Sequence, residues 1–293
     1  MYPILLKLGP LPIHSYGLMM AFGFLAGLFL ARRDAPKFGL DPDKIADAAF
    51  WVLLLALAGT RVAFIMMFPE DFSWSNPLGW FALWNGGLVF QGAIPPAVVF
   101  IWWWTRRHKM PFWTVCDLAA PCLALGHALG RLGCFLNGCC YGARTDMAWG
   151  ISFPRVPFDT AKPMTGSPAF LDHVHRFGLN PAIDQWSYHI HPTQLYSSFG
   201  LVILCILLIT LRKYCRPFHG STTCYYFFFY GIGRFGIEML RDDGNPILAF
   251  GMTTQQVMAL AASAAGVILW IVLSGLKKRR VLQKAAAQST PAK

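Results

Sequence analysis

Three arginines lie inside long apolar runs of this sequence, where a charged side chain requires a partner: Arg61, Arg131 and Arg234. A charge within a membrane-spanning helix costs at least ~2.5–3.5 kcal/mol on insertion scales. A guanidinium group can donate to two phosphate oxygens at once and keeps its charge at low dielectric. Arg131 and Arg234 together therefore predict a phosphate-binding site. Each arginine could instead reach the headgroups or neutralise a buried acid, an alternative that applies most readily to Arg61.

The segment from Gly130 to Gly142 includes the second arginine, Arg131, and contains four glycines in thirteen residues. Glycine lets backbone N–H groups approach an anion closely, and irregular backbone at membrane depth is tolerated where it lines a protein cavity. The same segment holds Cys134, Cys139 and Cys140. Adjacent cysteines rarely both bind one zinc ion and this spacing fits no common zinc pattern, so the sequence favours small buried thiols over a metal site.

A stripe of polar residues follows one face of the sixth apolar run. At about 100° per residue, Tyr230, Arg234, Glu238 and Arg241 fall on one side of a helix. Glu238 lies one turn after Arg234, so the two can form an ion pair. This face supplies both an acid and the cations for a site.

The composition places these residues in a membrane protein. Of the 293 residues, 55% are hydrophobic and 13% are charged, about half the usual charged share. Seven stretches are long enough to cross the hydrocarbon core as helices. They are residues 13–31, 46–68, 86–104, 114–136, 193–211, 222–240 and 253–276. Pro95-Pro96 and the glycines of residues 126–133 would kink or thin the third and fourth. The predicted fold class is therefore an all-α membrane protein.

Basic residues predict the orientation of these spans. Sixteen of the 25 Lys and Arg residues follow the first, third, fifth and seventh stretches, so these ends are expected to face the cytoplasm and the N-terminus the outside. Counting along the helices then places the three intramembrane arginines in the outer half, at roughly 22, 26 and 18 Å from the inner ends. We expect one domain over 1–293, with a small periplasmic cap over 137–192 and a loose cytoplasmic tail over 285–293.

Five separated motifs occur in an order that resembles the prolipoprotein diacylglyceryl transferase family. They are Tyr16-Gly17-Leu18, Asn85-Gly86-Gly87-Leu88, the arginine and glycine segment 130–142, His191-Pro192-Thr193-Gln194-Leu195-Tyr196, and Tyr230-Gly231 with Arg234 and Glu238. The resemblance covers Tyr16 to Arg241. It implies a bacterial inner-membrane enzyme that moves the diacylglyceryl group of phosphatidylglycerol onto the lipobox cysteine of a preprolipoprotein and releases glycerol phosphate.

The resemblance also implies roles for individual residues. Arg131 matches the phosphatidylglycerol-binding arginine and Arg234 a second essential arginine, while Tyr16, Tyr230 and Gly142 match further functional positions. We expect four more side chains to line the lipid site: Arg61, Asn137, Glu238 and Gln194. The expected partners are phosphatidylglycerol, the preprolipoprotein signal peptide and the bilayer, with no nucleic acid, no cofactor and no metal.

The sequence departs from the family at the proposed base. Gln91 occupies the position of a family histidine and cannot take a proton, so we expect it to position substrate. His127, one turn before Arg131, and His14 could substitute as the base, although a lone membrane histidine is more often a structural hydrogen-bonding group. Cys134 and Cys139 replace Asn and Glu of many members, which argues against base chemistry at Cys139. The alternative function is a transporter or channel for an organic anion, since intramembrane arginines also build anion pathways.

Overall fold

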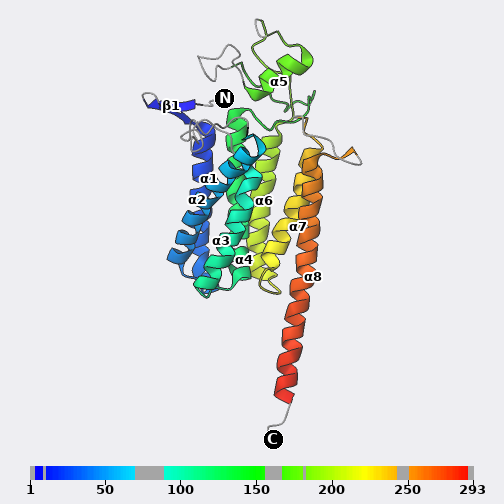
Figure 1. The fold of residues 1–293 in the computed structure, drawn as a ribbon. Coiled ribbons are helices and arrows are strands. Elements are labelled where there is room, and N and C mark those ends of the chain that lie inside the picture. The colour runs from blue at the N-terminus through cyan, green and yellow to red at the C-terminus, as the bar shows by residue number, and fades with distance from the viewer. Residues whose placement is uncertain are drawn as a thin grey trace. The chain divides into compact units, whose positions relative to one another are not determined.

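The computed structural model describes residues 4–8, 11–69, 89–155, 167–180, 183–242 and 251–289. Over these residues the chain is mainly helical (Figure 1). It divides into two compact units, Met1–Gly27 with Ala119–Lys293, and Leu28–Leu118. The first unit contains Arg131, Arg234 and the cysteine-rich segment, and the second contains Arg61 and Gln91.

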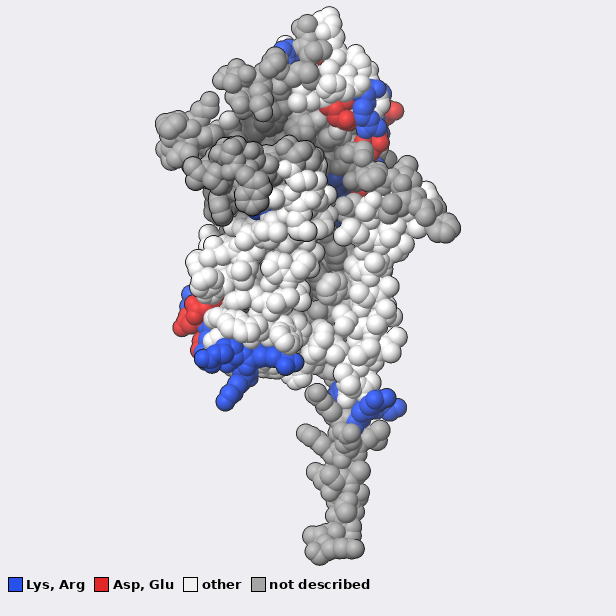
Figure 2. Space-filling model, viewed as in Figure 1, with Lys and Arg blue, Asp and Glu red and all other residues white. Residues whose placement is uncertain are grey.

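The described residues include five helices long and apolar enough to cross a membrane. These candidate spans are Ser15–Phe38, Pro42–Met67, Phe112–Asn137, Thr193–Tyr214 and Thr254–Arg279. Each overlaps one of the seven predicted stretches. On the face shown in Figure 2, few charged atoms lie over the middle of the helices, and blue and red atoms gather toward their ends. The chain is therefore a multi-pass membrane protein.

In the second unit, sequence signals mark where two helices end and begin. Helix α1 (Ser15–Asp34) ends here in the short turn η1 (Ala35–Phe38), which Gly39 closes at φ 67°. Helix α2 (Pro42–Met67) begins at Asp41, whose side chain accepts from the backbone N–H of Asp43. Proline at the first helical position suits this start because its missing N–H would have no partner there.

Helix α3 (Ile94–Arg107) is shorter than the predicted third stretch. It is preceded by the 3-10 turn η5 (Phe90–Ala93). Pro95 and Pro96 lie in the first turn of α3, where they start a helix, so the predicted kink is replaced by a helix boundary. Residues 86–88, where the stretch was expected to begin, lie outside the described residues.

The first unit contains the remaining helices. They are α4 (Phe112–Asn137), which enters it at Ala119, α5 (Pro168–Phe177), α6 (Thr193–Tyr214), α7 (Ser221–Glu238) and α8 (Thr254–Ser289). In Figure 1, α7 and α8 run side by side, and α8 continues past the end of α7. Residues 285–289, part of the expected loose tail, are helical.

Glycines set how closely the helices of the first unit approach. A Cβ added at Gly231 would collide with Ser263 and Ala259 of α8, and one added at Gly126 would lie 3.2 Å from the carbonyl oxygen of Gly23. Small residues at such crossings let two backbones come into direct contact, a common arrangement in membrane helices. The contacts fix α7 against α8 and α1 against α4.

Two short elements outside the helices were not predicted as such. Strands β1 (Ile4–Leu8) and β2 (Leu11–His14) form an antiparallel pair, so α1 begins at Ser15 instead of Ile13. Pro12 fits this boundary because a proline disfavours helical backbone in the residue before it. Within 137–192, the expected cap, the described residues include the helix α5 and isolated β-bridges, among them Ile151 with Ile190.

Candidate active site

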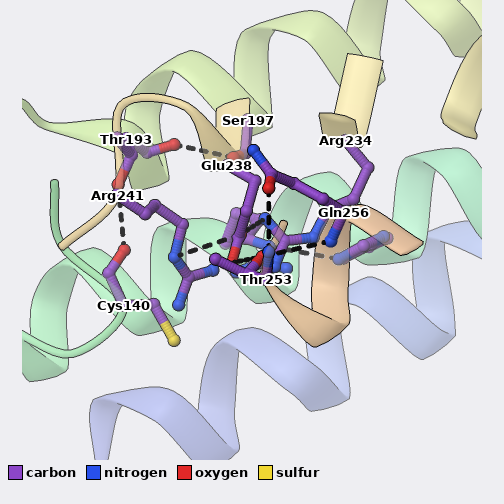
Figure 3. Close-up of polar contacts among 10 residues, drawn as sticks. Cys140, Thr193, Ser197, Arg234, Glu238, Arg241, Thr253 and Gln256 are labelled. Carbon is purple, nitrogen blue, oxygen red and sulfur yellow. Dashed lines mark hydrogen bonds and ion pairs between the residues drawn. The ribbon is translucent and has the colours of Figure 1, made fainter. Parts of the chain in front are cut away.

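A buried ion network occupies the end of α7. Nη1 of Arg234 lies 2.7 Å from Oε2 of Glu238, and Nε of Arg241 lies 3.7 Å from the same oxygen. Thr253 donates from Oγ1 to the other carboxylate oxygen of Glu238 at 3.1 Å (Figure 3). Glu238 is 3% exposed. The predicted pair of Arg234 and Glu238 and the predicted stripe along α7 are confirmed.

Arg131 joins this network from α4. Its Nε donates to Nε2 of His127 at 3.1 Å. The ring of His127 faces that of Tyr230 with centroids 5.7 Å apart, so α4 and α7 meet at this level. Arg131 also lies close enough to Arg234 to act on it electrostatically. The lone pair of His127 Nε2 is directed at a guanidinium group, which makes this residue a positioning group for Arg131 and not a free base.

We call Arg131, Arg234, Arg241 and Glu238 the arginine cluster. It holds three positive side chains and one negative side chain, in surroundings where burial makes each charge costly. Glu238 is bound to two of the arginines. The imbalance favours an added anion, and a phosphate group suits guanidinium donors best.

The backbone that follows α4 is irregular and held by side chains of α6. Gly138 and Cys140 have φ of 73° and 59°, in the left-handed region. Gln194, which is fully buried, donates from Nε2 to the carbonyl oxygen of Cys139 at 2.8 Å, and Thr193 donates to that of Cys140 at 3.0 Å. The segment is thus fixed in one conformation, as polar backbone at this depth requires.

Gly142 lies where three segments meet. Its N–H donates to the carbonyl oxygen of His191, and it forms a β-bridge with Arg241. A Cβ at this position would lie 2.6 Å from both Cβ of His191 and the carbonyl oxygen of Leu240. Only glycine fits here, and its contacts tie the segment after α4 to the end of α7 that carries Arg241.

Tyr16 and Asn137 belong to the same region of the first unit. Tyr16, in the first turn of α1, packs on Gly133 of α4, where an added Cβ would lie 3.2 Å from Cδ2 of the tyrosine ring. It is within electrostatic reach of Arg131 and of the three cysteines. Asn137 is the last residue of α4, directly before the left-handed Gly138.

Arg61 and Gln91 belong to the second unit. Arg61 is 8% exposed, with its guanidinium carbon 5.5 Å from the ring centroid of Phe64, and Gln91 is exposed on η5. The two elements meet where the N–H of Val89 donates to the carbonyl oxygen of Thr60. The motif Asn85-Gly86-Gly87-Leu88 lies outside the described residues. The roles of Arg61 and Gln91 stay predictions.

Sequence reasoning missed Thr253 and Gln256. The N–H of Thr253 donates to Oε1 of Gln256 at 2.9 Å, and the N–H of Gln256 donates to Oγ1 of Thr253 at 3.2 Å. These reciprocal bonds are a capping box, which a threonine followed three residues later by glutamine signals before an apolar run. The box starts α8 and aims the threonine hydroxyl at Glu238.

The cap is anchored to the end of α7. Arg176 of α5 pairs with Asp242 at 3.0 Å, a bond that raises the pKa of Arg176. His173 is 2% exposed, and burial lowers its pKa below the ordinary value. Its Nδ1 accepts from the N–H of Tyr188 at 3.1 Å. The cap therefore packs around a neutral histidine and is joined to the residue that follows Arg241.

Long apolar helices, a buried arginine cluster and irregular backbone beside it define a multi-pass membrane protein with buried charged side chains at one end of α7. Comparison with known proteins makes the class specific. The chain belongs to the prolipoprotein diacylglyceryl transferase family, whose model matches residues 3–272.

Several relatives carry the name phosphatidylglycerol–prolipoprotein diacylglyceryl transferase. One from Synechococcus elongatus is 32% identical over 94% of this chain and 89% of its own length. Others from Stenotrophomonas maltophilia and Photobacterium profundum are 31% and 34% identical, over 92% and 85% of this chain and 91% and 84% of their own lengths.

Proposed function

We propose that this chain transfers the diacylglyceryl group of phosphatidylglycerol to the lipobox cysteine thiol of a preprolipoprotein and releases glycerol phosphate. The observation that carries the proposal is the arginine cluster, in which Arg234 and Arg241 share one buried carboxylate and Arg131 acts electrostatically on Arg234. The leaving group of the reaction is a phosphate ester, the anion that such a cluster suits. The relatives' names give the same two substrates.

The site chemistry follows from where charge develops. The substrate thiolate attacks a glycerol carbon, the carbon–oxygen bond to phosphate breaks, and the electron pair stays on the phosphate oxygen. Arg131 and Arg234 grip that phosphate and stabilise the growing negative charge, an effect that is strong in a site of low dielectric constant. Glu238 holds Arg234 in place, and Arg241 shares the same carboxylate.

The remaining predicted residues orient the substrates. Tyr16 and Tyr230 orient the donor lipid or the thiol from α1 and α7. Gly142, Asn137 and Gln194 shape the backbone around the phosphate. Arg61 keeps its predicted role in lipid binding, and Gln91 keeps its predicted role of positioning substrate instead of removing a proton.

The proposal includes a membrane topology of seven spanning helices with the N-terminus outside the cytoplasm. The two spans beyond the five candidate spans are α3 and α7, and Arg234 and Glu238 lower the mean hydropathy of α7. Basic residues at the ends of the first, third, fifth and seventh spans support a cytoplasmic location for those ends. The active site then opens to the periplasmic leaflet of the bacterial inner membrane. Anion transport, the alternative function, is not favoured by the family match.

A transfer assay tests the function. Purified protein in detergent is mixed with phosphatidylglycerol and a lipobox peptide that carries Cys or Ser at the acceptor, and mass spectrometry follows the product. We expect a diacylglyceryl adduct on the Cys peptide alone. Arg131→Lys should lower transfer at least 100-fold, since one ammonium cannot replace a bidentate guanidinium; a loss of about 2.7 kcal/mol corresponds to that factor.

The matched control is Arg106→Lys. Arg106 stacks on Trp102 with 4.4 Å between its guanidinium carbon and the ring centroid, in the last turn of α3. That variant should keep full activity. No adduct with folded wild-type protein would refute the function, and full activity of Arg131→Lys would refute the phosphate clamp.

A further inference from the structure

Three thiols converge directly after Arg131. The sulfur atoms of Cys134, Cys139 and Cys140 all lie within 4.8 Å of one another. In a tetrahedral zinc site with Zn–S bonds of ~2.3 Å, sulfur atoms lie roughly 3.8 Å apart. Small side-chain rotations would therefore bring these three atoms onto one ion.

The backbone explains how adjacent cysteines can share an ion. Cys140 has φ 59°, in the left-handed region that a residue other than glycine seldom adopts, and Gly138 has φ 73°. These two turns fold Cys139 and Cys140 back toward Cys134 in the last turn of α4. Such backbone strain persists where the surroundings enforce it, and here Thr193 and Gln194 hold the two carbonyl groups.

A buried acceptor next to the thiols lacks a partner. Oε1 of Gln194 has no hydrogen-bond donor among the described residues, although the side chain is fully buried and its Nε2 is bonded to the carbonyl oxygen of Cys139. A buried acceptor left this way in a side chain that holds the cysteine segment suits a metal-bound water, because such a water could donate to it.

The substrate chemistry requires a thiolate, and two of the residues weighed as its base are not suited to that role. Gln91 cannot accept a proton, and Nε2 of His127 accepts from Arg131. A zinc ion bound by three protein ligands keeps its fourth position open, and a thiol that binds there loses its proton outright. A bound zinc ion would therefore remove the proton from the acceptor thiol, a step for which Gln91 stands in place of the family histidine.

We propose that Cys134, Cys139 and Cys140 bind one zinc ion whose open position takes the acceptor cysteine of the preprolipoprotein as a thiolate. This inference rests on the proposed function and goes beyond it. The acceptor thiol displaces water from zinc and releases one proton to solvent. Its sulfur then forms a bond to the glycerol carbon as the carbon–oxygen bond breaks, and the neutral thioether leaves zinc.

The position of the thiols fits this step. Cys134 lies three residues after Arg131 on the same helix, and both Arg131 and Arg241 act electrostatically on Cys140. The positive charges of the two arginines would compensate the negative charge of the thiolates bound to zinc. The nucleophile and the phosphate held by the arginines would therefore both reach one glycerol carbon, and an in-line displacement needs them on opposite sides of that carbon.

Metal analysis gives the first test. Protein purified without chelators should contain about one zinc per chain, and Cys139→Ser should contain less than a tenth of that. The matched control is Cys205→Ser, another buried cysteine, on α6, which should keep its zinc. Cys134→Ser and Cys140→Ser provide second variants if the first does not fold, as judged by size-exclusion chromatography and helical circular dichroism.

Cobalt substitution tests the open position without any transfer. Cobalt(II) in the site should show thiolate charge-transfer and tetrahedral d–d bands, and a lipobox Cys peptide should shift them toward four sulfur ligands while the Ser peptide does not. Arg131→Lys should keep this shift and lose transfer. No zinc in wild-type protein, or no shift with the Cys peptide, would overturn the inference.

Transfer activity separates this inference from the proposed function. Chelation should lower transfer at least tenfold, and added zinc should restore it. Full transfer by protein shown to be free of zinc would refute the zinc site and leave the proposed transferase function unaffected. No transfer by zinc-loaded wild-type protein would refute the proposed function instead.

Discussion

Replacement of Glu238 by glutamine removes the negative charge at the centre of the arginine cluster. The carboxylate lies 2.7 Å from Arg234 and 3.7 Å from Arg241, and its side chain is 1% exposed. Loss of one partner of a buried ion pair costs about 3–5 kcal/mol, because a charge is left uncompensated. Glutamine keeps the volume and can still accept from Thr253, so we expect the lower end of that range.

The expected loss is measurable as a shift in thermal unfolding. For a chain of this size about 1 kcal/mol corresponds to roughly 2 °C, so Glu238→Gln should lower the unfolding midpoint by roughly 6 °C. Tryptophan fluorescence of the protein in detergent would follow the transition. The control is Asp172→Asn, which removes an ion pair at 3.3 Å to Arg176 whose acid side chain is 29% exposed. Partly exposed pairs contribute about 0–1 kcal/mol, so this shift should stay below about 2 °C.

Two further measurements show whether the effect is electrostatic. The double variant Arg234→Gln with Glu238→Gln should be less destabilised than the sum of the single variants, by at least about 1 kcal/mol, because the two groups interact directly. Added phosphatidylglycerol should stabilise Glu238→Gln more than the wild type, since the carboxylate that Arg234 and Arg241 share is then removed. Two results would refute the charge balance described for the arginine cluster. One is a change in unfolding midpoint for Glu238→Gln equal to that of Asp172→Asn, and the other is a double variant whose destabilisation equals the sum of the single variants.

Three other perturbations test separate parts of the structure. Burial lowers the pKa of His173, so the contribution of this residue to stability is present above the unfolded pKa of about 6.5 and is lost as pH falls below that value. Hydrogen exchange of backbone amides in the cap, corrected for intrinsic rates, should therefore rise at pH 5.5. His173→Gln should abolish this pH dependence. Gly231→Ala should destabilise by about 1–3 kcal/mol because its Cβ would collide with α8, whereas Gly233→Ala, with nothing within 4 Å, should not. Gly142→Ala should lower transfer more than tenfold by displacing the segment after α4, and Gly200→Ala, also with nothing within 4 Å, serves as its control.

Much of the helical plan was predictable from hydropathy and charge. Five of the predicted stretches contain helices long and apolar enough to cross a membrane among the described residues. The signal is strong because a run of about 20 apolar residues is rare in proteins that do not cross a membrane. Helix boundaries were harder to predict. The sequence shows Pro95 and Pro96 but not whether they interrupt a helix or begin one, since either position removes a backbone donor.

The site was predictable where its residues lie close together in the sequence. Arg234, Glu238 and Arg241 follow helical periodicity, so their contacts could be derived from spacing alone. Contacts between distant segments could not. Nothing in the spacing places Gln194 on the carbonyl oxygen of Cys139, 55 residues earlier in the chain.

The cysteine segment shows what spacing alone cannot predict. Adjacent cysteines in a helix or strand point in different directions, so Cys139 and Cys140 argued against a shared ligand. The argument assumes regular backbone, and the left-handed conformation of Cys140 removes that assumption. Since a residue with a Cβ adopts this conformation only at a cost, the fold must stabilise it elsewhere, here through Thr193 and Gln194. The same hydrogen bonds that fix the backbone around Gly142 therefore also bring three thiols together beside Arg131, and one segment can serve both the phosphate and the nucleophile.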